Sequence, residues 1–203
     1  MKLYYAAGVC SLSPHIALLE AGLPHEAIAV TLPDHKLADG TDYYTINPLG
    51  YVPMLQLDDG TMLREGPAIV QYIADQVPEK NLAPANGTLA RYQLQSWLNF
   101  IATEVHKSYS PMFRPGSSDA TKDASRKRLT QLYTYIDQEL AQRDYLMGDT
   151  FTVADGYLFV TTNWADHAQL DISGFAHLQA FRARVAARPA VQQAMRAEGL
   201  IKD

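Results

Sequence analysis

The period of hydrophobic and polar positions changes repeatedly over residues 1–80, which is typical of short strands that alternate with helices. Strands are expected at 2–6, 26–32, 54–57 and 62–64. Ser13 can cap a first helix that has Pro14 at its first position, and a second helix is expected at 67–76. The turn residues at 58–61, Asp-Asp-Gly-Thr, predict a hairpin between the last two strands. This order predicts an α/β domain with a thioredoxin-like layout.

Beyond residue 87 the two-residue period disappears, and every long segment has the spacing of a helix. Helices are expected at 88–113, 119–142, 152–169, 174–187 and 189–197. Prolines and glycines separate these segments. We therefore predict a thioredoxin-like domain at 1–80, a linker at 81–87 and an all-helical domain at 88–203, which is an α/β domain followed by an all-α domain.

Length, charge and cysteine usage narrow the class of protein. At about 150 residues per domain, 203 residues fit one large domain or two small ones, and the change of period favours two. The net charge is −5 and the longest basic run is 126–128, so a nucleic acid is not expected as a partner. No window approaches the ~18 apolar residues of a membrane span. The single cysteine, Cys10, cannot form an internal disulfide, so we expect a cytoplasmic protein.

Cys10 lies between the expected end of the first strand and the start of the first helix. Unpaired amide groups and the positive end of the helix dipole favour an anion there, so this position predicts a thiol with a lowered pKa. The alternative is a small buried hydrophobic residue, because free cysteine is among the most buried residue types. Ser13 stands where the second cysteine of a Cys-x-x-Cys pair would be, which excludes an internal dithiol–disulfide cycle.

Two segments of the first domain can place backbone groups near a ligand. Pro53 follows Val52 at the start of the third strand. A proline cannot donate an N–H to a strand ladder, but it is tolerated at the first position of a strand or at an edge. Glu65 and Gly66 precede the helix at 67–76, where unpaired N–H groups can hold a carboxylate. The alternative for Glu65 is that it only caps this helix.

The first long helix of the second domain carries an uncharged polar stripe at helical spacing. Its members are Gln95, Asn99, Thr103, His106 and Ser110. A solvated face would normally carry lysine and glutamate, so this stripe indicates a face turned toward a cleft. His106 could then reach a thiolate across the domain junction, although a lone histidine is more often structural.

Thr152-Val153-Ala154-Asp155 has the spacing of a capping box at the start of a helix. The segment that follows is almost wholly apolar. We therefore expect Thr152 and Asp155 to fix the start of a buried helix, with a role in folding.

These motifs, taken in order, resemble the bacterial cysteine-type, or beta-class, glutathione transferases over essentially the whole chain. The matching segments are 2–5, 10–16, 47–48, 52–53, 57–61, 65–66, 72–75, 97–101, 104–107, 152–155 and 197–200. The resemblance implies an N-terminal glutathione-binding domain and a helical domain, with an electrophile bound in the cleft between them. It also implies a homodimer with glutathione as co-substrate and no metal.

In the first domain, the resemblance gives Cys10 a place facing the glutathione sulfur, with which it can form a mixed disulfide. Pro53 is expected to be cis, so that the backbone of Val52 pairs with the cysteinyl part of glutathione. Glu65 and the N–H of Gly66 would hold the γ-glutamyl end. Gly66 departs from the serine or threonine common in the wider superfamily, which leaves only its backbone donor.

The remaining contacts follow from the same resemblance. Relatives often use a lysine for the glycyl carboxylate, whereas this chain has His35 and Lys36, and the sequence leaves open which of them binds. Asn99 of the helical domain, from the same subunit or from the other one, would assist at the γ-glutamyl end. Thr103 and His106 would face the thiol, and His106 can polarise or deprotonate it.

Two further sets of side chains lie near these positions. Tyr5 and Ser11 stand where tyrosine-type and serine-type relatives activate the sulfur, but with Cys10 present we expect Tyr5 to pack and Ser11 to cap. The expected electrophile pocket is aromatic or apolar, which predicts hydrophobic substrates. It consists of Tyr109, Met112, Phe113 and Trp164.

The first functional hypothesis is a glutathione transferase that conjugates the glutathione thiol to hydrophobic electrophiles in detoxification, with Cys10 and His106 as catalytic residues. The alternative is a glutathione-dependent thiol–disulfide or reductive dehalogenation enzyme in which Cys10 is the nucleophile. A third hypothesis is a non-catalytic protein of the same fold that binds partners or sequesters ligands.

Overall fold

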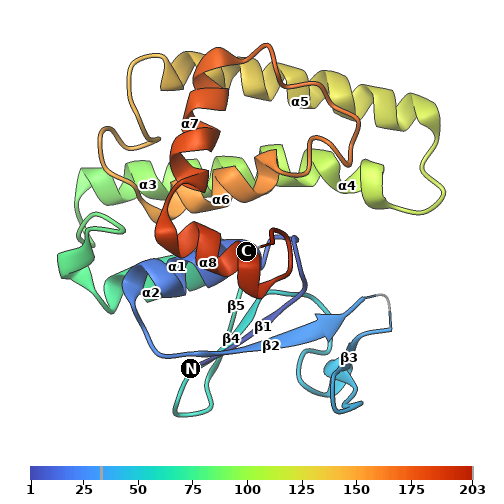
Figure 1. Cartoon of the computed structure of the whole chain (residues 1–203), viewed down its shortest axis with the longest axis vertical. Helices are drawn as coiled ribbons and strands as arrows, with labels where there is room; N and C mark the ends of the chain where they lie inside the picture. The colour runs from blue at the N-terminus through green and yellow to red at the C-terminus, as the bar shows by residue number, and fades with distance from the viewer. Residues whose placement is uncertain (33, 203) are drawn as a thin grey trace. The chain divides into compact units, whose positions relative to one another are not determined.

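The computed structural model describes residues 1–32 and 34–202 of the chain. The chain divides into two compact units, drawn together in Figure 1. One unit contains Met1–Leu82 and Arg188–Asp203, and the other contains Ala83–Ala187.

The first unit is built on a five-stranded mixed sheet in the order β3-β2-β1-β4-β5. The strands are β1 (Lys2–Tyr5), β2 (Glu26–Thr31), β3 (Lys36–Leu37), β4 (Met54–Gln56) and β5 (Met62–Arg64). Strands β1 and β2 are parallel, and the other neighbours pair antiparallel. The helix α1 (Leu12–Ala21) connects β1 to β2, which is the βαβ unit that the sequence predicts.

Both faces of this sheet are covered, as the alternation of side chains along β1 shows. Leu3 and Tyr4 point to opposite faces because the side-chain period of a strand is two. Tyr4 packs with Val30, Tyr43 and Met54 in one buried cluster. Leu3 is fully buried on the other face, where Figure 1 shows α1 and α2 (Gly66–Asp75) beside the sheet.

The start of α1 differs from the expected one. The helix begins at Leu12 with Ser11 at the N-cap, and Ser13 is a buried residue inside it, so the expectation that Ser13 caps α1 is wrong. The side chain of Ser11 makes no capping hydrogen bond either. Its hydroxyl accepts a hydrogen bond from the Ala6 N–H (3.1 Å) and donates one to the Ala6 carbonyl oxygen (3.0 Å). The Ser11 hydroxyl is therefore bonded to the residue after β1, and the expectation that its side chain caps α1 is also wrong.

The connection after β2 contains the short strand β3, which is not among the strands expected from the sequence. The 3₁₀ turn η1 (Tyr43–Thr45) follows it and is capped by the Asp42 carboxylate, which accepts a hydrogen bond from the Tyr44 N–H. Two residues are too few for a visible two-residue period, so the pattern of the sequence does not predict this strand.

The last helix, α8 (Pro189–Ala197), belongs to the first unit, whereas the sequence assigned 188–203 to the helical domain. It packs against α1. The guanidinium of Arg188 forms a bidentate pair with the carboxylate of Glu20 at 2.5 and 2.8 Å. The spacing of apolar residues predicts a helix correctly but does not specify what that helix packs against, which explains this difference.

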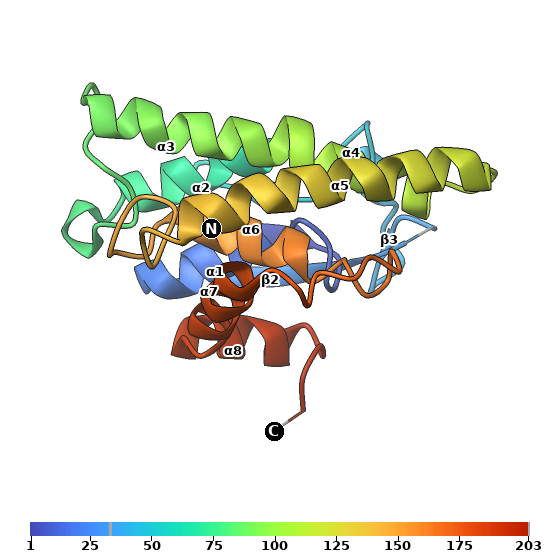
Figure 2. The same ribbon diagram turned by 90° about the horizontal axis from the view of Figure 1, so that it is seen from above.

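The second unit is all-helical. Its elements are α3 (Leu89–Phe100), η3 (Ile101–His106), α4 (Lys107–Phe113), α5 (Asp119–Leu140), α6 (Val153–Thr162) and α7 (Ala176–Ala186). Figure 2 shows the length of α3 and α5. The segment expected as one helix at 88–113 is interrupted because η3 is a π-helix, in which hydrogen bonds join residues five apart instead of four.

Helix α6 is the centre of the second unit. All ten of its residues are buried, as its apolar sequence predicts, and it packs against α3, η3 and α7. The expected capping box is confirmed, with the Thr152 N–H donating to the Asp155 carboxylate at 2.8 Å. The same carboxylate accepts a hydrogen bond from the Leu146 N–H at 2.7 Å. The helix ends at Thr162 instead of continuing to 169.

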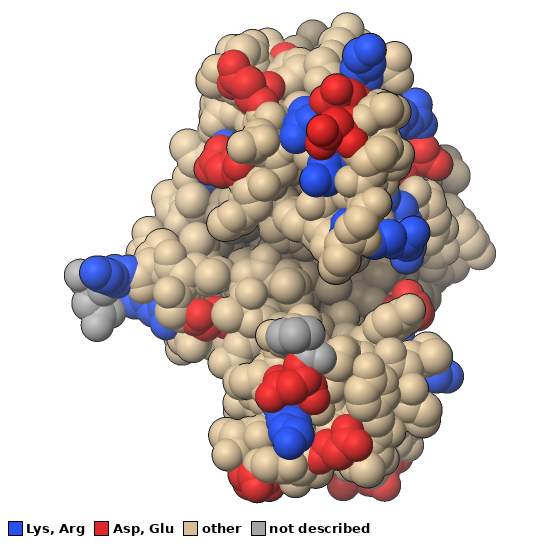
Figure 3. Space-filling model, turned by 90° about the vertical axis from the view of Figure 1, so that its right-hand side faces the viewer, with Lys and Arg blue, Asp and Glu red and all other residues tan. Residues whose placement is uncertain are grey.

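Charged side chains are spread over the surface. The face drawn in Figure 3 carries Lys and Arg interspersed with Asp and Glu. Within the described residues, no helix has the length and apolar character needed to cross a membrane.

Candidate functional site

Cys10 lies in the turn between β1 and α1, at the N-terminal end of a ten-residue helix. Its half-buried thiol donates a hydrogen bond to the carbonyl oxygen of Val52 at 3.3 Å. The backbone carbonyl of Cys10 accepts the N–H of Ser13 in the first turn of α1. Cys10 is therefore not a fully buried core residue, and its sulfur lies beside the segment that leads into β4.

The peptide bond between Val52 and Pro53 is cis, as the resemblance implied. Pro53 is buried, and a Cβ placed on Gly66 would lie 3.9 Å from its Cγ atom. Because Val52 also contacts Cys10, one small region of the first unit contains the thiol, the cis peptide and the start of α2.

Glu65 stands at the N-cap of α2 but makes no capping hydrogen bond with its side chain. Its backbone has φ 66° and ψ 114°, a region that residues other than glycine rarely adopt. The side chain is exposed. Simple helix capping therefore does not describe Glu65, and backbone strain of this kind is common at ligand sites.

His35 and Lys36 have different surroundings. The ring of His35 packs against Tyr44 with 4.7 Å between centroids, and its backbone has φ 51°. Its Nδ1 atom is buried without a hydrogen-bond partner in the described part of the chain. Lys36 is exposed on β3. A buried unpaired nitrogen is costly, so His35 is the more distinctive of the two residues.

A buried carboxylate that we did not predict holds the Cys10 turn in place. Glu198 follows α8, and its Oε2 atom accepts the Gly8 N–H at 2.9 Å. Its Oε1 atom lies 2.9 Å from His15 Nδ1 in α1. Burial, and next the charge of Glu198, raise the pKa of Tyr5, whose ring packs against His15 as expected. The segment at 197–200 carried the resemblance, but no local pattern gives Glu198 a partner.

In the second unit, the polar stripe is continuous only over its first part. Asn99 and Thr103 are both exposed, and the Thr103 hydroxyl donates to the Asn99 carbonyl oxygen at 3.0 Å. Beyond Ile101 the π-helix changes the angle between successive residues, so the α-helical spacing used to predict the stripe no longer applies. Asn99 and Thr103 share a face, and His106 ends the π-helical segment.

His106 is held by aromatic residues. Its Nδ1 atom lies 2.7 Å from the hydroxyl oxygen of Tyr157 in α6, and its ring meets Trp164 edge-on at 4.8 Å between centroids. Burial, and next the positive charge of Lys107, lower the pKa of His106 to about 4. The imidazole is therefore neutral at physiological pH. Tyr157 was not among the predicted site residues, because the apolar pattern of 153–162 marks it only as core.

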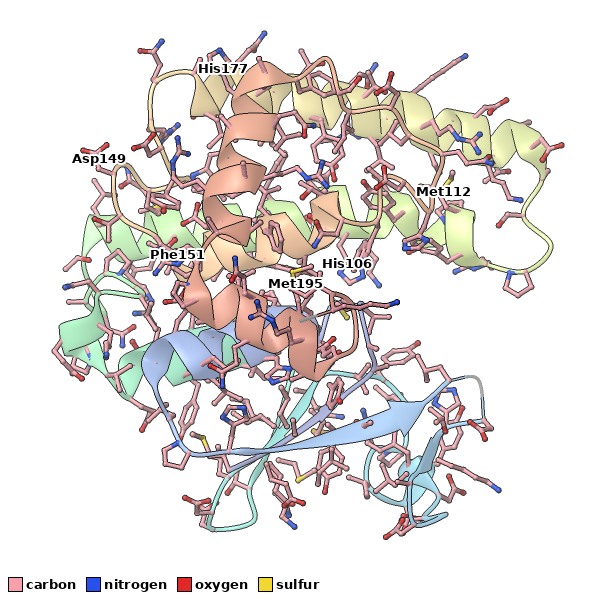
Figure 4. The ribbon with its side chains drawn as sticks, viewed as in Figure 1. His106, Met112, Asp149, Phe151, His177 and Met195 are labelled. Carbon is pink, nitrogen blue, oxygen red and sulfur yellow. The ribbon has the colours of Figure 1, made fainter. Side chains whose placement is uncertain are left out.

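The expected electrophile pocket is an aromatic cluster beside His106. Trp164 meets Tyr109 at 5.5 Å and Phe113 at 6.3 Å between ring centroids, in both cases edge-on. Tyr109 is buried, and its hydroxyl is 2.8 Å from that of Tyr133, so Tyr109 supplies the floor of the cluster. Phe113 is half exposed, and Met112, labelled with His106 in Figure 4, is half-buried on the same helix.

Each unit therefore contains a group of the predicted residues. In the first unit Cys10, Val52, Pro53 and Gly66 lie together, and in the second unit His106 lies with Tyr109, Phe113 and Trp164. Over residues 1–32 and 34–202, no three His, Cys, Asp or Glu side chains group in a way that could hold a metal ion.

Comparison with known proteins matches both units. The model of the glutathione S-transferase N-terminal domain matches residues 8–76, and that of the C-terminal domain matches residues 100–189. The glutathione S-transferase GstA of Escherichia coli O157:H7 is 44% identical over 200 residues, which cover 98% of this chain and 100% of that protein.

Solved structures agree closely with this fold. A ternary complex of BphK, a bacterial GST, has 57% identity and a TM-score of 0.96, with 98% of this chain and 100% of that chain covered. A sphingomonad glutathione S-transferase complexed with glutathione has 46% identity and a TM-score of 0.95, with 99% and 100% covered. A beta-class glutathione S-transferase of Sphingomonas chungbukensis has 46% identity and a TM-score of 0.96, again with 99% and 100% covered. This chain belongs to the glutathione S-transferase family, in its bacterial beta class.

Proposed function

We propose that this glutathione transferase joins the sulfur of glutathione to hydrophobic electrophiles. The observation that carries the proposal is the arrangement around Cys10, where a thiol at a helix N-terminus, a cis peptide at Pro53 and the strained Glu65 belong to adjoining segments. The complex of a sphingomonad relative with glutathione supports the choice of co-substrate.

In this proposal the first unit binds the peptide backbone of glutathione. Glu65 and the N–H of Gly66 hold the γ-glutamyl end, and this is supported by an exposed Glu65 carboxylate that caps no helix. The backbone of Val52 pairs with the cysteinyl part. His35 or Lys36 binds the glycyl carboxylate. An anion near the start of α2 also gains from the helix dipole.

The second unit contributes to the reaction itself. We assign Asn99 to the γ-glutamyl end and Thr103 and His106 to the thiol. The sulfur lone pair forms the new bond to carbon, the leaving group departs with its electron pair, and the thiol proton is released. A neutral His106 can interact with the sulfur through its second ring nitrogen.

The electrophile is proposed to bind the aromatic cluster of Tyr109, Met112, Phe113 and Trp164. Flat aromatic walls favour hydrophobic, aromatic or halogenated substrates. A role in detoxification, a cytoplasmic location and assembly as a homodimer belong to the same proposal.

A second candidate function uses Cys10 itself as a redox nucleophile. The observation that favours it is a half-buried thiol in contact with Val52, in the only cysteine of the chain. Its thiolate would attack the glutathionyl sulfur of a mixed disulfide between glutathione and another thiol, which releases that thiol as a thiolate and leaves glutathione joined to Cys10. A second glutathione would then attack this bond, which restores Cys10 and releases glutathione disulfide. A purely ligand-sequestering role has less support, because the relatives are named transferases.

The experiment that separates the two functions compares Cys10→Ala with the native protein in two assays. One assay follows conjugation of a chloronitroaromatic, and the other follows glutathione-dependent reduction of a mixed disulfide. If Cys10→Ala retains conjugation and loses disulfide reduction, Cys10 is a redox residue and not the centre of conjugation. Loss of both activities with glutathione still bound would make Cys10 the centre of both. Failure of the native protein to bind immobilised glutathione would contradict both functions.

A further inference from the structure

The contact between His106 and Tyr157 constrains both the orientation of the His106 ring and the position of its ring hydrogen. The Tyr157 hydroxyl oxygen lies 2.7 Å from His106 Nδ1, and the two rings are nearly perpendicular, at 84°. Tyr157 lies in the wholly buried helix α6 and is 4% exposed. The core of the second unit thus fixes the position of the phenol, and the His106 ring is oriented by its contact with this hydroxyl.

The chemistry of the two groups decides which of them donates. In a neutral imidazole one ring nitrogen carries a hydrogen and the other accepts, and the partner of one nitrogen determines the state of the other. A phenol O–H is more acidic than an imidazole N–H, and an imidazole nitrogen is more basic than a phenol oxygen. The Tyr157 O–H therefore donates to Nδ1, which leaves the ring hydrogen on Nε2.

The Nε2 atom is the part of His106 that remains available. Among the described residues no hydrogen bond to Nε2 is present, and Nε2 is not one of the buried unpaired nitrogens. Trp164 packs edge-on against the ring at 4.8 Å and limits its rotation. The second ring nitrogen is thus oriented and accessible to a ligand.

We propose that Tyr157 is a positioning residue that holds His106 in the Nε2–H form, so that His106 donates a hydrogen bond to the glutathione sulfur instead of removing its proton. This inference rests on the proposed glutathione transferase function. The hydrogen bond stabilises the thiolate, and the thiol proton passes to bulk water. No proton is stored on His106 during the reaction.

The low basicity of His106 agrees with this role. A general base works best when its pKa lies near the operating pH, whereas burial lowers that of His106 to about 4. A thiol with a pKa of about 8.5 would transfer very little of its proton to such a base. A hydrogen-bond donor is not weakened by this low pKa, because the neutral imidazole keeps its N–H. A hydrogen bond from that N–H to the charged form of the thiol favours the charged form.

The position of the ring hydrogen can be measured without glutathione. In ¹⁵N-labelled native protein near neutral pH, the long-range ¹H–¹⁵N spectrum of His106 should show the hydrogen on Nε2. In Tyr157→Phe, which keeps the ring and loses only the hydroxyl, this preference should be lost. A native His106 with its hydrogen on Nδ1, or with both nitrogens protonated, would overturn the proposal.

A second measurement tests the donor role. The ultraviolet absorbance of the thiolate gives the titration midpoint of bound glutathione in the native protein and in Tyr157→Phe, His106→Ala and His106→Gln. We expect the midpoint to rise by about one pH unit in the first two variants, because a hydrogen bond to the charged form is lost. His106→Gln retains an N–H donor but no base, so part of the native shift should remain.

Tyr145→Phe is the matched control, because it removes the hydroxyl of a buried tyrosine elsewhere in the second unit and should leave the midpoint at the native value. The proposal is wrong if His106→Gln behaves like His106→Ala, or if Tyr157→Phe titrates like the native protein. If native protein fails to bind glutathione, the proposed transferase function fails instead, and the spectrum of His106 still reports on Tyr157.

Discussion

At the scale of single residues, Glu65 differs from an ordinary helix cap in its strained backbone and in its exposed carboxylate, which makes no capping hydrogen bond. If that carboxylate binds the amino group of glutathione, Glu65→Gln should weaken the affinity about tenfold, because a charge-assisted hydrogen bond becomes a neutral one. Isothermal titration with glutathione measures the change. The matched control is Glu79→Gln, an exposed carboxylate of the same unit, and equal affinity in the two variants would contradict the assignment.

His106 should give stability a dependence on pH. Its pKa is about 4 in the folded protein and about 6.5 when unfolded, so between these values the unfolded chain takes up a proton that the folded protein does not. The contribution of His106 is therefore fully present above pH 6.5 and is lost as the pH falls toward 4.

Urea unfolding of the native protein and of His106→Gln tests this expectation. The measurements are made at several pH values between about 7.5 and 4.5, a range that extends from above the unfolded pKa toward the folded one. The difference in the free energy of unfolding between the two proteins should shrink as the pH falls. His167→Gln, which replaces an exposed histidine of the same unit, should show no such trend. A constant difference for His106→Gln would mean that His106 titrates normally.

At the scale of elements, α8 and the residues after it stabilise the turn that carries Cys10. The Glu198 side chain is fully buried between the Gly8 N–H and His15, so Glu198→Ala removes the acceptor of a half-buried N–H and the partner of a buried histidine. We expect the free energy of unfolding to fall by about 3 kcal/mol, as when one member of a buried pair is removed.

Hydrogen exchange locates this effect. In Glu198→Ala the amides of residues 8–12 should exchange faster, because the Gly8 N–H loses its acceptor. Glu26→Ala removes an exposed ion pair with Lys2 and should cost less than about 1 kcal/mol, with unchanged exchange in the turn. Similar losses of stability in the two variants would show that Glu198 does not anchor the turn.

The element that the sequence pattern could not supply is η3. An α-helical stripe was predicted through Thr103 and His106 at fixed angles, but the backbone there forms π-helical hydrogen bonds. No residue type marks such a turn, since it depends on how the helix packs along its length. Contact of η3 with α6 brings His106 to Tyr157, a residue that the sequence predicted only as core.

At the scale of the whole molecule, assembly as a homodimer can be tested directly. Two large side chains at the start of α3 are unusually exposed, Leu89 at 75% and Tyr92 at 61%, and exposed apolar patches often mark contacts between chains. Sedimentation should give a mass twice the 22.5 kDa of one chain. Replacing both residues by aspartate should shift the protein toward the monomer, whereas a native protein of 22.5 kDa would exclude the homodimer.

Much of the candidate site could be read from the sequence because its members stand at the ends of predicted elements. Cys10 between β1 and α1, Pro53 before β4 and Glu65 before α2 all lie where local pattern places them. The contacts that hold the site in place were not predicted. Glu198 and His15 are 183 positions apart, and His106 and Tyr157 are 51 apart, so no local period relates them.

The sequence by itself determined the division into an α/β part and a helical part, most strands and helices, and the capping box at Thr152, because each depends on residues within a few positions of one another. Only the tertiary structure decided that α8 joins the first unit, that Ser11 bonds to Ala6 instead of capping α1, and that Tyr157 holds His106. The first and third are contacts between groups far apart along the chain, and the second is a choice of the Ser11 hydroxyl between two possible hydrogen-bond partners. The folded chain selects among them by burying apolar surface while pairing the polar groups that become buried with it.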